Sequence, residues 1–308
     1  MTADSFRIAH ISDPHLTTLR GIQAGELCNK RILGYLSWLL RRRREHRREV
    51  LSALIQDVRD RKPDHLVITG DLTHVGTARE CDEAAHWLRE VSTGLPLTLI
   101  PGNHDCYAPA SWPDTLGKWA GFMAGDDPVV PVPGFNSFPA LRRRGPVAII
   151  GLSSAVPSLP FFATGTLGAA QLQKLEQLLI EAVGAGLFRL VLVHHPPLPA
   201  PLDRRRALTD ATGLQQVLKR AGAELILHGH SHCWLNTLVP GPVDHIPALG
   251  TPSASANVFH AGRRAGYGIL DITTTASGWE VEITQFELAP DASSFRRRDG
   301  IQLQRPRA

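Results

Sequence analysis

The chain has 308 residues, 43% hydrophobic and 20% charged, a composition that is ordinary for a soluble globular protein and excludes an intrinsically disordered one. Its 33 lysines and arginines against 29 aspartates and glutamates give a formal net charge of +4, which is too small to predict nucleic-acid binding unless the basic residues are clustered. The four cysteines lack the spacing of a zinc knuckle. No apolar run approaches the roughly 20 residues of a membrane span, and the first residues do not resemble a secretory signal. We therefore expect a cytoplasmic protein that is at most peripherally attached to a membrane.

Short apolar runs rich in β-forming residues recur along the chain, with helix-like segments between them. The predicted strands are 6–11, 65–69, 97–100, 147–152, 187–193 and 224–227, followed by 267–273 and 279–288. Apolar residues at helical spacing predict helices over 50–58, 78–91 and 169–183. Buried strands that alternate with helices predict the α/β fold class.

The chain is expected to form one domain over residues 1–289, followed by a polar, basic C-terminal tail over 290–308. Within this domain, residues 17–44 exceed what a strand–helix–strand crossover needs and are predicted to be a helical insertion. Two stretches rich in proline, 109–139 and 196–201, are predicted to be surface loops beside functional strand ends.

Polar motifs follow the predicted strands at the points where these strands end. They are Asp13-Pro14-His15, Gly70-Asp71, Gly102-Asn103-His104-Asp105, His194-His195 and Gly229-His230-Ser231-His232. Because open α/β sheets place their ligand sites at the carboxyl ends of strands, we expect these side chains to share one crevice. Carboxylates, an amide and imidazoles without sulfur suit first-row metals.

The chemistry of phosphoester hydrolysis explains why such residues would be gathered. Two cations about 3.5–4 Å apart can acidify water and neutralise the charge that builds up on the phosphoryl group. Glycines before Asp71, Asn103 and His230 would let the backbone turn sharply at the strand ends. In the D-x-H and H-x-H tripeptides, both outer side chains can face one side of an extended segment.

The ordered set D-x-H, G-D, G-N-H-D, H and G-H-x-H resembles the calcineurin-like metallophosphoesterases, over a span from Asp13 to His232. The resemblance implies a four-layer α/β/β/α sandwich of two mixed β-sheets flanked by helices. It also implies two metal ions, one held by Asp13, His15 and His232 and the other by Asn103, His194 and His230, with Asp71 bridging them. Manganese, iron and zinc all accept these ligands, so the identity of the metals stays open.

The same resemblance suggests roles for the residues beside these ligands. His104 would stabilise the transferring phosphoryl group or protonate the leaving oxygen, and Asp105 matches the position that orients this histidine. Either His194 or His195 can be the ligand on residues alone. The resemblance implies His194, because the ligand of the family takes the position directly after Val193, and this leaves His195 near the substrate or behind the ligands.

The predicted reaction is metal-assisted attack of hydroxide on a phosphodiester, such as a cyclic nucleotide, a glycerophosphodiester or a similar small substrate. The alternatives are hydrolysis of a membrane-associated lipid phosphate or pyrophosphate through the helix at 29–48, and nuclease activity. The lipid A pathway pyrophosphohydrolases carry arginine where His104 stands here, which disfavours the pyrophosphate alternative. A non-catalytic metal-binding scaffold is the least favoured alternative, because His104 accompanies a complete ligand set.

The insertion contains an apolar helical stretch from Ile32 to Leu40, followed by arginines at 41–44, 47 and 48. This order is typical of an interfacial helix that contacts an anionic membrane or covers an amphiphilic substrate. The more common alternative is that the helix packs on its own domain or forms a homodimer with a second copy. Nucleic acid ranks third as a partner, because no aromatic residues interleave the basic ones.

Overall fold

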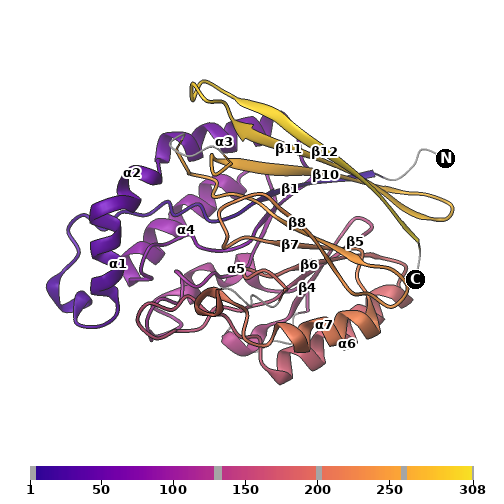
Figure 1. Ribbon diagram of the computed structural model, residues 1–308, viewed down its shortest axis with the longest axis horizontal. Helices are drawn as coiled ribbons and strands as arrows, with labels where there is room; N and C mark the ends of the chain where they lie inside the picture. Colours follow the sequence, from indigo (N-terminus) through magenta and orange to yellow (C-terminus); the bar gives the residue numbers. More distant parts are fainter. Residues whose placement is uncertain (1–4, 128–133, 199–202, 258–261, 307–308) are drawn as a thin grey trace.

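The computed structural model describes residues 5–127, 134–198, 203–257 and 262–306, and within them two six-stranded sheets pack face to face (Figure 1). The strand order is β12-β11-β10-β1-β2-β3 in the first sheet and β4-β5-β6-β7-β9-β8 in the second. Helices cover the outer face of each sheet. The predicted α/β class and the four-layer α/β/β/α arrangement are therefore confirmed.

The first sheet joins a parallel half to an antiparallel half. Its strands are β1 Ser5–Ile11, β2 His65–Ile68, β3 Leu97–Leu99, β10 Gly266–Thr274, β11 Gly278–Leu288 and β12 Phe295–Pro306. The three strands β1, β2 and β3 run parallel, whereas β10 pairs with β1 and β11 in the antiparallel sense. The carboxyl ends of the parallel strands consequently lie at one edge of this sheet.

The second sheet has a parallel centre with an antiparallel strand at each side. Its strands are β4 Ala140–Arg144, β5 Val147–Gly151, β6 Phe188–Leu192, β7 Leu225–His228, β8 Leu235–Val239 and β9 Ile246–Gly250. The strands β5, β6, β7 and β9 are parallel, and β4 and β8 flank them. Strands β4, β8 and β9 are absent from the predicted elements.

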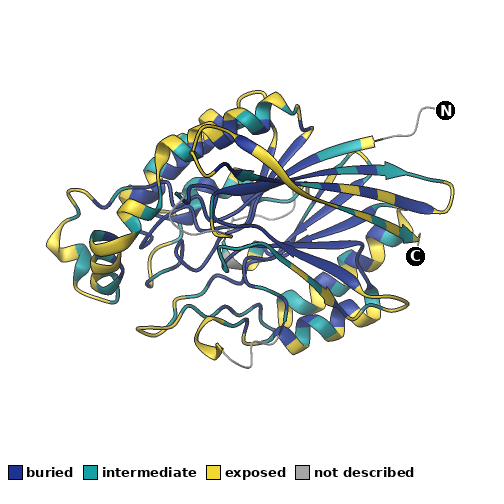
Figure 2. Cartoon of the chain, turned by 45° about the horizontal axis from the view of Figure 1, so that its top comes forward, coloured by how far each residue is buried: buried dark blue, intermediate teal, exposed yellow. Residues whose placement is uncertain are grey.

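Side-chain alternation along the strands separates the central core from the outer helical layers. In β6, Leu190 and Leu192 join the core between the two sheets, whereas Val191 packs with the helices that cover the second sheet. Helices α3 Arg48–Asp60 and α4 Ala78–Ser92 cover the first sheet, and α6 Ala169–Gly184 and α7 Ala211–Ala221 cover the second. Figure 2 shows the corresponding pattern, with buried strands inside and exposed residues on the outer sides of the helices.

The C-terminal segment corrects the prediction of a polar tail over 290–308. Residues 295–306 form β12, which pairs with β11 along most of its length. Phe295 is buried, and Ile301 and Leu303 pack partly against the core, while the polar and basic residues between them face solvent. Because β12 is an edge strand with one exposed face, its composition resembles that of a tail.

The stretch 109–139 is also more ordered than a surface loop. It contains the 3₁₀ turn η3 Leu116–Trp119 and the short helix α5 Ala120–Met123, and a further turn, η4, at Phe135–Ser137. Trp119 is fully buried (0% exposed), and its indole N–H donates to the carbonyl of Cys81 at 2.9 Å. Residues 128–133 lie outside the described part of the chain, as do residues 199–201 of the other predicted loop.

The insertion forms a bent helical segment at one end of the two sheets (Figure 1). It consists of η1 Ala24–Leu27, α1 Arg31–Ser37, the π-helical turn η2 Trp38–Arg42 and α2 Arg43–Glu45. Trp38 is buried (6% exposed) against Leu19 and Val75, so one face of the segment packs on the domain. None of the described helices combines the length and the hydrophobicity needed to cross a bilayer.

Buried Glu80 in the first turn of α4 connects the insertion to the loop after β2. Its carboxylate accepts hydrogen bonds from the Thr17 hydroxyl at 2.7 Å and from the backbone N–H groups of His74 and Thr77 at 2.7 and 3.0 Å. Together with the Thr77 side chain it forms the capping box of the helix. One carboxylate thus fixes both the helix start and the loop that follows Asp71.

We expect Glu80→Ala to lower the free energy of unfolding by about 2–4 kcal/mol, because several buried donors lose their acceptor at once. Urea denaturation measures this change. Exposed Glu90 on the same helix provides the control, and Glu90→Ala should alter stability by less than about 0.5 kcal/mol. Equal effects of the two substitutions would contradict the role assigned to Glu80.

Candidate metal centre

Five strand ends bring the candidate ligands together. The loop after β1 carries Asp13 and His15, the loop after β2 carries Asp71, and the loop after β3 carries Asn103. His194 follows β6, and His230 and His232 follow β7. Apart from His232, which is partly exposed, all of these residues are buried. The structure therefore gathers all seven of the side chains that the sequence selects.

The first group consists of Asp13, His15, Asp71 and His232, each of which offers a ligand atom within 4.8 Å of the others. The Nδ1–H of His15 donates to the carbonyl of Thr73 at 2.9 Å, which turns Nε2 toward the group. His15 Nε2 is buried without a hydrogen-bond partner, and Asp13 Oδ1, which also lacks a hydrogen bond of good geometry, lies 3.1 Å from His232 Nε2. Unsatisfied buried acceptors are costly, so this arrangement fits a cation that would accept their lone pairs.

The second group meets at the side-chain oxygen of Asn103. His194 Nε2 lies 3.2 Å and His230 Nδ1 lies 2.8 Å from Asn103 Oδ1. The other nitrogen of each imidazole donates to a backbone carbonyl. His194 Nδ1 donates to the carbonyl of Thr69 at 2.6 Å, and His230 Nε2 donates to that of Arg206 at 3.0 Å. The ring orientation is thus fixed by the backbone, and the remaining nitrogens face a common point.

Asp71 lies between the two groups. Its Oδ2 is 3.8 Å from His15 Nε2 and 3.4 Å from His194 Nε2, while Oδ1 accepts the backbone N–H of His104 at 2.7 Å. Although burial lowers the pKa of His194, the Asp71 and Asp13 carboxylates raise it to about 9. A cation in this position would replace the proton that the imidazole otherwise holds.

The ligand loops owe their shape to left-handed backbone conformations. Positive φ angles occur at Asp13 (50°), His15 (38°), Asp71 (60°), His230 (67°) and His232 (51°). The D-x-H and H-x-H tripeptides are therefore not extended, in contrast to the prediction, and both outer side chains converge because the chain turns at each of them. Such conformations cost roughly 1–3 kcal/mol each and are typical of functional sites.

Two glycines allow the loops to approach one another. A Cβ at Gly102 would collide with the Asp71 carboxylate, and a Cβ at Gly229 would collide with the side chains of Ser12 and Asp13. The predicted need for glycine before Asn103 and His230 is thus explained by close contact between loops rather than by the turn itself.

The structure gives Asp105 a different set of partners from the one expected. Its carboxylate accepts the backbone N–H groups of Asp71, Leu72, Thr73 and Gly102, all at 2.9–3.0 Å. Burial and the neighbouring Asp71 raise the pKa of Asp105 to about 7, whereas these N–H donors oppose the rise. No contact between Asp105 and the His104 ring occurs among the described residues, so Asp105 holds two ligand loops together instead.

The His104 imidazole is held by other groups. Its Nδ1–H donates to the carbonyl of His74 at 2.6 Å, and Arg42 Nη1 lies 2.9 Å from its Nε2 and 3.2 Å from its Nδ1. Burial and then Arg42 hold the pKa of His104 well below its usual value. The imidazole is consequently neutral near pH 7, and a guanidinium from the insertion lies close to both of its ring nitrogens.

His195 does not line the pocket beside the candidate ligands. Its Nδ1 is 2.8 Å from the Ser154 hydroxyl, its Nε2 is 3.1 Å from the carbonyl of Ala163, and its ring packs 4.4 Å from that of His230. The expected contact with substrate is therefore not provided by this geometry. His195 supports His230 from behind.

Several residues of the pocket escape prediction from the sequence. A pocket of about 260 Å³ lies in front of the candidate ligands, and its wall includes Arg42, His46, Arg206 and Arg263. His46 approaches His15, with ring centroids 4.5 Å apart, and can complete an alternative ligand group with His15 and His232. The arginine runs at 41–44 and 204–206 are the available signals for Arg42 and Arg206, since guanidinium groups bind phosphates.

Comparison with known proteins gives a consistent result. A family model described as calcineurin-like phosphoesterase matches residues 6–234. A probable cyclic nucleotide phosphodiesterase from Synechococcus sp. is 28% identical over 184 residues, 59% of this chain and 62% of the relative. A similarly named protein from another Synechococcus strain is 28% identical over 270 residues, 82% of this chain and 84% of the relative.

A third relative is named for the substrates it acts on. The cAMP/cGMP dual specificity phosphodiesterase from Mycobacterium tuberculosis is 29% identical over 185 residues, 58% of this chain and 52% of that protein. The match thus spans less than two thirds of the length of this relative and of the first Synechococcus protein.

Two solved structures share the fold. A dimetal phosphatase from Danio rerio superposes with a TM-score of 0.62 at 11% identity, covering 98% of this chain and 99% of that one. The NAD nucleotidase from Haemophilus influenzae gives a TM-score of 0.51 at 14% identity, covering 97% of this chain and 54% of that one. At such identities the likeness concerns the fold alone.

We expect Asp71→Ala to lose both metal ions, because two cations without a shared carboxylate repel each other. Elemental analysis of the desalted protein by inductively coupled plasma mass spectrometry measures the metal content. Asp71→Asn, which keeps the size of the side chain and removes its charge, should also bind both ions more weakly. The exposed Asp60→Ala is the matched control. Two tightly bound ions in Asp71→Ala would exclude the shared carboxylate.

Proposed function

Because the chain belongs to the calcineurin-like phosphoesterase family, we propose that it is a metal-dependent hydrolase of small phosphodiesters, with cyclic nucleotides as the first substrates to test. The observation that carries this proposal is the convergence of seven ligand side chains, including buried atoms of Asp13 and His15 that lack hydrogen bonds. The printed names of three relatives support the choice of substrate class.

In this proposal, Asp13, His15 and His232 hold one ion, Asn103, His194 and His230 hold the other, and Asp71 contacts both. When bound, the ions would supply Lewis acidity, by acidifying water and neutralising phosphoryl oxygens. Manganese, iron and zinc remain equally compatible with these nitrogen and oxygen ligands.

The residues around the ligands bind and orient the substrate. Arg42, Arg206 and Arg263 line the pocket and carry charges suited to the non-bridging oxygens of a phosphodiester. The His104 ring contacts Arg42 Nη1 and thereby positions the Arg42 guanidinium at the pocket. This geometry favours stabilisation of the phosphoryl group over protonation of the leaving oxygen, because the Nε2 of His104 carries no proton to donate.

Metal-loaded protein should hydrolyse bis(p-nitrophenyl) phosphate and at least one natural diester among cAMP, cGMP and glycerophosphodiesters.

His104→Ala should slow this turnover by roughly 10²–10⁴ while both ions stay bound. A positioning role predicts equal losses for nitrophenolate and alkoxide leaving groups, whereas a lost acid would affect the alkoxide most.

The control is His86→Ala, an exposed histidine on α4 that should leave turnover unchanged. Single-stranded DNA in the same screen tests nuclease activity. If the protein holds two ions and hydrolyses none of these substrates, it is a scaffold rather than an enzyme.

An exposed apolar surface beside the pocket favours a second candidate, the hydrolysis of an amphiphilic phosphate at a membrane. Ile32, Leu36 and Leu40 lie on one exposed side of the insertion, and Leu40 is 75% exposed. A neighbouring loop contains Leu159 and Phe161, and Phe161 is 76% exposed. Lys30 joins this loop to α1, because its Nζ lies 2.7 Å from the Ser158 hydroxyl and donates to the Phe162 carbonyl at 3.0 Å.

These apolar residues flank the pocket itself. Ser37, Arg41 and Arg42 from the insertion and Ala163 after the loop are all part of the pocket wall. Apolar groups beside arginines are typical of surfaces that contact anionic lipids. The candidate therefore joins membrane contact and the phosphoesterase pocket in one surface.

If this second candidate holds, the protein should sediment with phosphatidylglycerol vesicles. Leu36→Asp combined with Leu40→Asp should then lower partitioning at least about tenfold, because two exposed apolar side chains that would enter the membrane are replaced by charged ones. The matched control combines Ile180→Asp with Leu238→Asp, two exposed apolar residues outside this surface. Partitioning that is absent, or that both pairs lower equally, would rule out this surface.

A further inference from the structure

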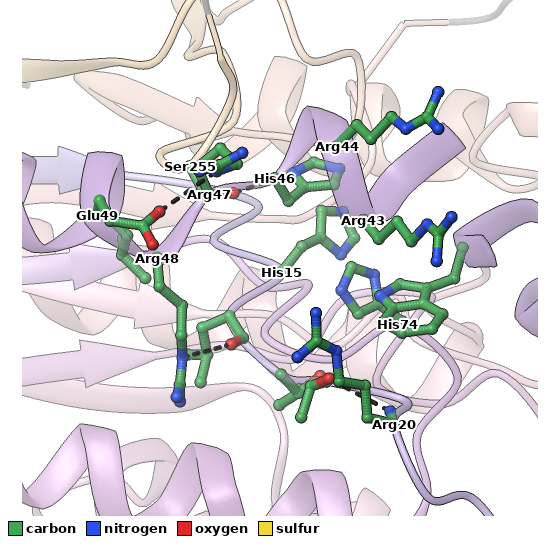
Figure 3. Close-up of a pocket in the computed structure, with 15 residues that line it drawn as sticks. His15, Arg20, Arg43, Arg44, His46, Arg47, Arg48, Glu49, His74 and Ser255 are labelled. Carbon is green, nitrogen blue, oxygen red and sulfur yellow. Dashed lines mark hydrogen bonds and ion pairs between the residues drawn. The ribbon is translucent and has the colours of Figure 1, made fainter. Parts of the chain in front are cut away.

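A second cavity, of about 570 Å³, shares His46 with the pocket (Figure 3). It is bounded by the segment after β1, by α2 and by the start of α3. The arginines in its wall are Arg20, Arg43, Arg44, Arg47 and Arg48. We refer to it as the arginine cavity.

Most of the positive charge in the arginine cavity is not neutralised. Arg47 pairs with Glu49 at 3.3 Å and Arg48 with Glu83 at 2.7 Å. For the guanidinium groups of Arg20, Arg43 and Arg44, no ion pair is formed within the described ranges. Glu49 is the one acidic residue that lines the cavity, and it is already paired with Arg47.

Three imidazoles, those of His15, His46 and His74, form the inner wall of the cavity (Figure 3). His74 is buried, and its Nδ1 has no hydrogen-bond partner. The unpaired arginines that line the cavity with these imidazoles are the groups that would bind an anionic ligand.

The arginine cavity and the pocket have different lining residues, although the cavity adjoins the candidate metal centre through His15. Arg41 and Arg42 line the pocket, whereas the next two residues, Arg43 and Arg44, line the cavity. Of the lining residues, His46 alone belongs to both walls. The helical segment thus presents successive arginines to two separate spaces.

We propose that the arginine cavity is a second binding site, and that it takes the phosphate groups of a small phosphorylated molecule. Arginines bind phosphate oxygens through paired, charge-assisted hydrogen bonds, and several unpaired arginines match a ligand with more than one phosphate. The volume lies in the range of small-molecule sites. The proposal does not depend on hydrolysis at the metal centre.

The probe for this site is inositol hexakissulfate, because its sulfate esters keep their charge at every working pH, bind metals weakly and are not phosphoesters. Isothermal titration of the metal-loaded protein should show saturable binding. Arg20→Ala combined with Arg43→Ala removes two unpaired guanidinium groups beside His74 and should raise Kd at least about tenfold. The control, Arg296→Ala with Arg297→Ala on exposed β12, removes the same charge and should change Kd less than about twofold.

Competition then identifies the source of the phosphates. If they belong to a separate ligand, the probe leaves the KM of a diester substrate unchanged. If they are a distal part of the substrate, the probe raises KM for a polyphosphorylated diester but not for bis(p-nitrophenyl) phosphate. The absence of saturable binding, or equal weakening by the two double variants with unchanged circular dichroism, would overturn the proposed site.

Discussion

The hydrogen bonds between the Asp105 carboxylate and the backbone of two ligand loops are the interaction on which the candidate metal centre depends. One side chain accepts N–H groups from Gly102, in the loop after β3, and from the residues 71–73 that follow β2. These bonds offset the cost of burying a charged group, and they fix where Asp71 and Asn103 stand relative to each other. The remaining ligands come from loops that pack against this pair.

The insertion shows how one short segment can serve several parts of a protein. Trp38 anchors it in a small apolar cluster, and the π-helical turn that begins at this residue shifts the following side chains relative to a regular α-helix. Arg42 consequently contacts His104 at the pocket, while Arg43 lies at the arginine cavity. The outer side keeps Leu40 exposed. Substrate, second ligand and membrane would therefore all be sensed through the same helical segment.

The strand ends and their ligands could be predicted from the sequence, because each motif is a local pattern of residues. The order of the motifs along the chain then indicates the family and its set of ligands. Arg42 and His46 could not, because their contacts depend on how the insertion folds back over the strand ends. The sequence motif predicts that Asp105 lies beside His104 and Asn103. Its hydrogen-bond partners could not be predicted, because they depend on how the loops pack against each other. The strand β12 escaped prediction for a different reason, since an edge strand with one solvated face has too few apolar residues to be distinguished from a tail.

The left-handed turns at Asp13, His15, His230 and His232 have a consequence for the thermodynamics of the whole protein. An unfolded chain rarely adopts these conformations at neighbouring positions, so it offers metal ions no preformed chelate. Nearly all of the affinity then belongs to the native state, and by linkage each tenfold rise in free metal above saturation adds about 1.4 kcal/mol per ion to the folding free energy. The concentration of free metal would in this way set the fraction of the protein that is folded.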